Sequence, residues 1–260
     1  MFRQLQSRIG TRTQRAALKP ALPILLAVVL TSFVHPANAE DLIKGFAVAE
    51  PEMALERYIA GGESAPWPIS SIEIHAALPR INKTGQLLAI RRLSTIGENR
   101  YEVLQLSGDR TVKDQVIVRY LHAEERAMEI PPAAIAISPA NYKFAYGGVV
   151  DDGERKAYVF RITPRRKREG LIKGELWLDQ RTGVPVRRAG RMVKSPSVFI
   201  RRVAVSQENA LRDGIVESRL TRISVDTRVV GRAQLVIQER PLVSADAARF
   251  ATWGDGGGQQ

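Results

Sequence analysis

The sequence predicts a mainly β protein of the α+β class: a single curved antiparallel sheet of roughly ten strands, forming an unclosed half-barrel with one or two helices as a lid. Three observations lead to this fold. From residue 141 onward, β-type segments follow one another almost without interruption. An earlier group of three such segments has the same alternation. Only two segments between residues 40 and 140 have helical character.

The first 39 residues have the features of a secretory signal peptide. Five basic residues and no acidic one precede the apolar run from residue 21 to 34, and small residues at Ala37 and Ala39 follow it. The run is shorter than the roughly 18 residues that a membrane span needs. We therefore expect cleavage near Ala39 and a periplasmic location, with an uncleaved anchor as the alternative.

After the predicted signal peptide, the sequence predicts a short helix followed by an antiparallel meander. Residues 51–60 contain good helix formers, with Pro51 at the first position and Gly61 and Gly62 after the end. Alternating apolar residues then predict strands over 71–78, 85–93 and 100–106, which are separated by turns rich in Asn and Gly.

Residues 111–127 are the clearest helix candidate. Val112, Val116 and Tyr120 recur at helical spacing, and Thr111 with Asp114 resembles a capping box. The β-branched run from Val116 to Val118 favours a strand instead. Two prolines at 131 and 132 then predict a loop.

The second half of the chain completes the sheet. The predicted strands are 142–149, 156–163, 171–179, 184–194, 198–206, 214–226 and 228–238. Short connections and the lack of a linker favour one domain over residues 40–252, followed by a mobile tail over residues 253–260.

Composition narrows the possible functions. The chain has no cysteine, which excludes disulfides, thiolate metal sites and Cys nucleophiles. Five of the 39 basic residues and none of the 27 acidic ones lie in the leader, so the rest keeps 34 basic and 27 acidic residues, a formal charge of +7. Export removes nucleic acid as the partner for this charge and leaves anionic headgroups or acidic proteins.

The sequence contains no recognisable catalytic or metal motif. His75 and His122 lack metal-ligand spacing, and we expect a surface imidazole at each position. There is no nucleophile elbow, phosphate loop or paired-carboxylate motif. We therefore expect a protein that is not an enzyme and uses neither cofactor nor metal; a hydrolase remains a third alternative, because the fold could bring two carboxylates together.

Two patterns point to binding. Basic residues are dense in the second half, and we expect them to form a docking patch: Arg165, Arg166, Lys167, Arg168, Arg187 and Arg191. A solvated face balanced by acidic residues is the alternative. Consecutive apolar residues in the central strands predict a partly covered apolar concavity, although ordinary core packing would leave the same pattern. The candidate lining residues are Ile72, Ile74, Tyr101, Phe160, Trp177 and Phe199.

Residues 141–206 resemble the superfamily of bacterial lipoprotein carriers. The similarity lies in Tyr158-Val-Phe-Arg-Ile-Thr-Pro164, Gly174-Glu-Leu-Trp-Leu-Asp179 and Thr182-Gly-Val-Pro-Val-Arg187. The resemblance implies an antiparallel half-barrel with a cavity for acyl chains and no turnover. It also implies an arginine in the cavity that holds the lid, for which Arg91 or Arg92 is the candidate. The loop over 127–140 and the basic run 165–168 do not match the family's pattern.

Two functional hypotheses follow. In the first, a periplasmic half-barrel holds an acyl chain, a lipid or a lipidated protein, in outer-membrane lipoprotein sorting, and docks on a membrane partner protein or anionic headgroups. In the second, the sheet is a scaffold or envelope-stress regulator that makes protein contacts through the basic patch. Loss of partner binding without loss of lipid binding, on charge reversal of Arg165, Arg166 and Arg168, would favour the second hypothesis.

Overall fold

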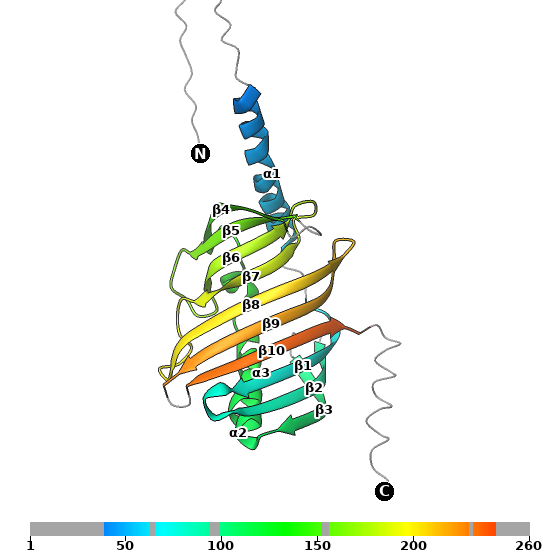
Figure 1. Ribbon diagram of the computed structural model, residues 1–260, viewed down its shortest axis with the longest axis vertical. Helices are drawn as coiled ribbons and strands as arrows, with labels where there is room; N and C mark the ends of the chain where they lie inside the picture. Colours follow the sequence, from blue (N-terminus) through cyan, green and yellow to red (C-terminus); the bar gives the residue numbers. More distant parts are fainter. Residues whose placement is uncertain (1–38, 63–65, 94–98, 152–155, 229–230, 243–260) are drawn as a thin grey trace, which may run out of the picture. The chain divides into compact units, whose positions relative to one another are not determined.

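Ten strands form one antiparallel sheet in the computed structural model (Figure 1). The structure describes residues 39–62, 66–93, 99–151, 156–228 and 231–242. The strands are β1 (Ile69–Leu78), β2 (Lys83–Leu93), β3 (Asn99–Gly108), β4 (Tyr142–Asp151), β5 (Lys156–Pro164), β6 (Ile172–Asp179), β7 (Pro185–Met192), β8 (Ile200–Arg212), β9 (Ile215–Thr227) and β10 (Arg232–Pro241).

The order of the strands is β3-β2-β1-β10-β9-β8-β7-β6-β5-β4. All neighbours but one are consecutive in the chain, as short hairpin connections require. The exception is β1, which pairs with β10 from Ser70 opposite Pro241 to Ala77 opposite Gln234. The first and last strands of the sheet therefore pair with each other inside it, and β3 and β4 are its edges. The predicted class, a mainly β protein with one unclosed antiparallel sheet, is confirmed.

Helical segments are few. They are α1 (Ala39–Gly61), η1 (Pro79–Ile81), α2 (Arg110–Val112), the π-helical turn η2 (Lys113–Ile117), α3 (Val118–Met128) and α4 (Pro132–Ile135). No helix in the described parts of the chain is both long and apolar enough to cross a membrane.

The first helix begins twelve residues earlier than predicted. The sequence prediction placed Pro51 in the first turn, but Pro51 lies inside α1. Proline is tolerated best in a first turn, so it suggested a start that the structure does not have. The predicted signal peptide, residues 1–39, lies outside the described residues apart from Ala39, and so does the predicted tail, residues 253–260.

The predicted helix over 111–127 exists, with a different beginning and an irregular turn. Asp109, and not Thr111, is the N-cap residue of α2, because its carboxylate accepts a hydrogen bond from the Thr111 amide at 2.7 Å. The β-branched residues Val116 and Ile117 lie in the π-helical turn, and α3 begins at Val118. Crowding of branched side chains against the preceding turn disfavours a regular helix there.

Other boundaries also differ from the predictions. The predicted loop after Pro131 contains the one-turn helix α4. The predicted strand over 198–206 begins at Ile200 and runs on to Arg212. The predicted strand over 228–238 is β10, which begins at Arg232; before it, the Thr227 amide and hydroxyl both donate to the Gly231 carbonyl oxygen at 2.8 Å.

The inner face of the sheet is the face that carries the buried core. Residues directly opposite each other on neighbouring strands share a face. One such row crosses the inner face through Leu87, Ile74, Ile237, Thr221, Gln207, Arg188, Leu176 and Phe160. The row is apolar at both ends and polar in its middle. We call the opposite side the outer face.

Candidate functional site

Two separate apolar clusters lie on the inner face. The first is built by β1, β2 and β10 with the helical segments α2 and η2, and Tyr120 and Leu121 of α3 pack against it. The second is built by β4, β5 and β6 with α1 and the segment around Ile137. The buried members of the two clusters come from opposite ends of the sheet, so the core is divided.

A central strip of apolar side chains lies on β8 and β9, between the strands of the two clusters, and its β9 members Ile223 and Val225 also pack against the first cluster. We define it as Val203 and Val205 of β8 with Ile223 and Val225 of β9, which oppose one another across the ladder. Val203 is 8% exposed, and the other three are half-buried. Gly190 on β7 opposes Val205 and contributes no side chain. Beside the polar middle of the inner face, β8 and β9 therefore carry an apolar area of which three side chains are less deeply buried than the two clusters.

A polar row runs across the same face beside the central strip. We define it as Arg91, Ser70, Glu239, Arg219, Asn209, Gln207 and Arg188. Its centre is Glu239, which is 6% exposed. Glu239 Oε1 accepts hydrogen bonds from Arg91 Nη2 and from Ser70 Oγ, and the bond from Ser70 is 2.9 Å long. The other Glu239 oxygen lies 3.6 Å from Arg219 Nη1.

The row continues toward β7 through amide side chains. Arg219 Nε donates to Asn209 Oδ1 at 3.4 Å, and Gln207 Nε2 donates to the same oxygen at 3.3 Å. Arg188 Nε donates to Gln207 Oε1 at 2.9 Å. Asn209 and Gln207 are each 8% exposed. Because buried polar groups need partners, each member fixes the position of the next.

A cluster of two tyrosines and Glu124, formed by α3 and β3, lies close to Arg91 and Glu239. Tyr101 Oη and Tyr120 Oη each donate to one oxygen of Glu124. Burial, followed by the Glu124 carboxylate, raises the pKa of both tyrosines well above the ordinary value, while Arg91 acts in the opposite direction on Tyr101. Both phenols therefore remain neutral donors, and they attach α3 to the sheet beside the polar row.

The six predicted apolar residues occupy four different surroundings. Ile72 and Ile74 are buried in the first cluster, against which Tyr101 packs, and Phe160 is buried in the second cluster. Trp177 lies on the outer face, where the Arg187 guanidinium stacks 4.5 Å from its ring. Phe199 is 64% exposed in the connection between β7 and β8. The structure thus does not gather these six side chains around one volume.

The predicted basic residues lie in two places. The segment from Arg165 to Arg168 connects β5 to β6 and is exposed. Arg165 Nε donates to the carbonyl oxygens of Pro139 and Tyr142 at 2.8 and 3.2 Å, which ties this segment to the loop before β4. Arg191 opposes Lys173 on the outer face near the same end of the sheet.

Arg187 does not share the surroundings of Arg191. Besides stacking on Trp177, its Nε lies 3.8 Å from Glu208. Arg191 is exposed and stands opposite Ala204. Of the two β7 residues in the predicted docking patch, Arg187 is therefore held by an aromatic ring and Arg191 is open to solvent.

His75 and His122 have ordinary surface positions. His75 Nε2 lies 2.7 Å from Glu73 Oε1 and is exposed, as is His122. Within the described ranges, no three His, Asp or Glu side chains gather in a way that could hold a metal ion.

Sequence reasoning missed the polar row, apart from Arg91. Glu239, Arg219 and Asn209 look like solvent-facing residues of alternating strands, because a polar residue at an inner-face position breaks the apolar pattern. One signal was present in the sequence: Arg91 and Glu239 each fall in phase with the apolar residues of their own strands, at Leu87 and Ala89 and at Leu235 and Ile237. An oppositely charged pair in phase with two apolar faces favours a buried ion pair.

No protein-family model matches this chain, and no curated protein sequence matches it. Three solved structures match it. The first is a LolA superfamily protein from Nitrosomonas europaea, with 12% identity and a TM-score of 0.31, and the match covers 76% of this chain and 96% of that one. The second is a DUF1329 family protein from Desulfovibrio piger, with 12% identity, a TM-score of 0.37, and coverage of 78% and 96% of the two chains. The third is a domain provisionally named an outer membrane lipoprotein-sorting protein from Vibrio parahaemolyticus, with 11% identity, a TM-score of 0.28, and coverage of 79% and 97%. Two of these names agree with the family that the sequence resembles. Overlap at these TM-scores says nothing about the site of this chain.

Proposed function

We propose that this protein is a periplasmic, non-enzymatic binding protein that holds the acyl chain of a lipid or lipidated protein on the central strip, and that it serves outer-membrane lipoprotein sorting. The observation that carries the proposal is the division of the core. Two clusters bury the ends of the inner face, and Val205, Ile223 and Val225 between them keep part of their surface exposed. Covering this surface with hydrocarbon is favourable by about 25 cal/mol per Å².

The polar row gives such a ligand an orientation. An acyl-bearing molecule has a polar end with ester or amide carbonyls, which accept hydrogen bonds. Arg188 and Arg219 line the strip on one side, and the hydrogen bonds within the row hold their guanidinium groups in place. We infer that the acyl chain lies along Val203, Val205, Ile223 and Val225, and that the polar end of the ligand lies beside these arginines.

In this proposal Arg91 does not donate hydrogen bonds to the ligand. Its guanidinium is bound to Glu239, and its Nε is buried with no hydrogen-bond partner among the described residues. We propose that Arg91 anchors the polar row beneath α3, where Tyr101 and Tyr120 meet Glu124. Movement of α3 would then change the cover of the strip without breaking the sheet.

Binding of a fluorescent fatty acid to the purified chain tests the proposal. Val205→Asp places a carboxylate on the strip, and we expect it to weaken probe binding tenfold or more, since a charge without a partner is excluded from hydrocarbon. Ala204→Asp is the matched control, because Ala204 is the next residue of β8 and faces the outer side. Equal binding by wild type and the Val205→Asp variant would contradict the proposal.

A further inference from the structure

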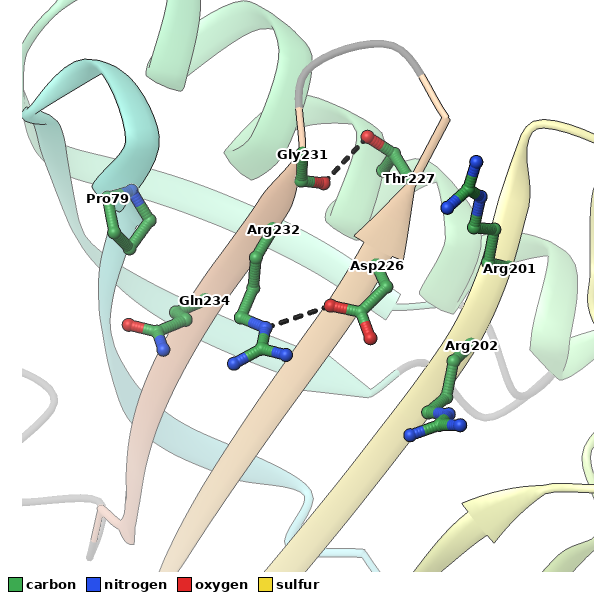
Figure 2. Close-up of a pocket in the computed structure, with 8 residues that line it drawn as sticks. All are labelled: Pro79, Arg201, Arg202, Asp226, Thr227, Gly231, Arg232 and Gln234. Carbon is green, nitrogen blue, oxygen red and sulfur yellow. Dashed lines mark hydrogen bonds and ion pairs between the residues drawn. The ribbon is translucent and has the colours of Figure 1, made fainter.

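A hollow of about 650 Å³ lies on the outer face, where β8 begins and the β9–β10 turn closes. Its lining includes Arg201 and Arg202 of β8, Asp226 of β9, and Arg232 and Gln234 of β10 (Figure 2). The ladder places Arg202 opposite Asp226, and Asp226 opposite Arg232. The inner-face neighbours Val203, Val225 and Ala233 belong to the other side of the sheet, so this hollow is separate from the central strip.

The hollow has an excess of positive charge. Arg232 Nε donates to Asp226 Oδ1 at 2.8 Å. This bond lowers the pKa of Asp226 and raises that of Arg232, and Arg202 and Arg201 lower the pKa of Asp226 further. One carboxylate thus stands among three guanidinium groups. No hydrogen bond or ion pair joins the side chain of Arg201 or Arg202 to any residue that the structure describes, although both act on the Asp226 carboxylate through their charge.

The ion pair between Asp226 and Arg232 fixes the position of the Arg232 side chain and adds a negative charge to the hollow. It holds Arg232 beside the carboxylate, while Arg202 approaches the carboxylate from the neighbouring strand (Figure 2). Neighbouring strands lie about 5 Å apart, so the backbones of Arg202 and Arg232 lie about 10 Å apart on either side of Asp226. Two long arginine side chains can span this distance and share one oxyanion between them. The planar guanidinium is the side chain best matched to phosphate oxygens.

Exposed apolar residues adjoin this charge. Val198 and Phe199 are 79% and 64% exposed. They directly precede β8, and the Phe199 carbonyl oxygen accepts from the Arg228 amide at 3.0 Å, which ties them to the end of β9. A free phosphate ion would make no favourable contact with these apolar side chains. A bilayer surface has a phosphate layer above hydrocarbon, and it would accommodate both groups at once.

We propose that this end of the outer face binds an anionic lipid bilayer, with a lipid phosphate group between Arg201, Arg202 and Arg232 and with Val198 and Phe199 inserted among the headgroups. The occupant is the membrane surface and not a soluble anion. This docking does not depend on the proposed acyl binding, because the two sites lie on opposite faces of the sheet.

Cosedimentation with lipid vesicles tests the proposal. The wild-type chain should bind phosphatidylcholine vesicles that contain phosphatidylglycerol, bind pure phosphatidylcholine vesicles much less, and lose binding at high salt. The double substitution Arg201→Gln/Arg202→Gln should lower the partition coefficient about thirtyfold, which corresponds to about 1 kcal/mol for each basic residue near an anionic surface. Phe199→Ser should lower it at every salt concentration, because its contribution is apolar.

A matched control separates this site from general basic charge. Arg119→Gln/Arg126→Gln removes the same charge from two exposed positions of α3 and should leave vesicle binding unchanged within about twofold. An equal loss in both double variants would overturn the proposal. So would a loss only in Arg166→Gln/Lys167→Gln, which would place docking on the β5–β6 connection.

A competition experiment distinguishes lipid from free anion. Inorganic phosphate at millimolar concentration should not displace the wild-type chain from vesicles beyond the effect of chloride at equal ionic strength. Displacement by phosphate alone would assign the hollow to a soluble anion and overturn the proposal. Fatty-acid binding by the Arg201→Gln/Arg202→Gln variant should equal that of wild type. Loss of fatty-acid binding would show that this variant is misfolded. The vesicle binding of Phe199→Ser would then decide whether this end of the outer face docks on the membrane.

Discussion

At the residue scale, two adjacent arginines have opposite surroundings. Arg91 is buried and bound to Glu239, while Arg92, one position further along β2, makes an exposed ion pair with Glu102 at 3.3 Å. Alternation of faces along the strand is the whole cause of this difference. The two pairs therefore provide an internal comparison of buried and exposed ion pairs.

Glu239→Ala should lower the free energy of unfolding by about 3 kcal/mol or more, because it leaves Arg91 buried without its counter-charge. Glu102→Ala removes the same kind of carboxylate from the exposed pair and should cost less than about 1 kcal/mol. Urea denaturation of both variants measures the difference. Similar values for the two variants would show that the polar row does not stabilise the fold.

The raised pKa values of Tyr101 and Tyr120 predict a dependence on alkaline pH. In the unfolded chain a tyrosine ionises near pH 10, whereas in the folded chain both phenols stay neutral above that pH. Their contribution to stability is thus complete below pH 10 and is lost as the pH rises toward the folded pKa. The free energy of unfolding should fall by about 1 kcal/mol for each tyrosine by pH 11.

Tyr120→Phe should remove its share of this alkaline loss when urea denaturation at pH 8 is compared with that at pH 11. Tyr146→Phe is the control, since Tyr146 is 48% exposed on β4. An identical pH dependence in wild type and in the Tyr120→Phe variant would contradict the assigned role of Glu124 and its two phenols.

At the element scale, Gly174 and Gly190 set the spacing of β6 and β7. The two residues stand directly opposite each other. A Cβ atom added at Gly174 would overlap the Ala189 carbonyl oxygen and the Gly190 Cα, and one added at Gly190 would lie 2.6 Å from the Lys173 carbonyl oxygen. Backbone atoms of a ladder cannot give way as a flexible side chain can, so these positions require glycine.

Gly174→Ala should destabilise the protein by about 2–3 kcal/mol through overpacking. Gly61→Ala is the control, because Gly61 ends α1 and nothing lies within 4 Å of an added Cβ. Its effect should stay within about 1 kcal/mol of wild type. Thermal unfolding of both variants checks the prediction, and a Gly174→Ala variant as stable as wild type would refute the close approach of the two strands.

The strands also show which parts of the fold the sequence could predict and which it could not. Alternation and turn residues located each strand, because Gly, Asn and Pro mark the joints whatever the tertiary structure. β8 was predicted too short at its end because Gln207 and Asn209 are polar at inner-face positions, and only the polar row of the folded sheet satisfies them. The pairing of β1 with β10 has no local signal, since it joins residues more than 150 positions apart.

At the scale of the whole molecule, the site was harder to predict than the fold. Ile72, Ile74 and Phe160 were predicted to line a concavity, and in the structure they pack in two clusters. An apolar alternation does not distinguish a filled core from a lining surface. Trp177 and Phe199 came from runs of consecutive apolar residues, in which alternate side chains necessarily point to opposite faces. The central strip depends on where helices end above the sheet, which strand patterns do not encode.

Native mass spectrometry of the full chain, purified from a membrane-containing extract, tests whether the strip between the two clusters holds an acyl-bearing ligand. We expect a species heavier than the chain by the mass of one lipid or lipopeptide, absent from the Val205→Asp variant and present in the Ala204→Asp variant. Repeated recovery of the ligand-free wild-type chain from such extracts, or an adduct that Val205→Asp leaves in place, would contradict it.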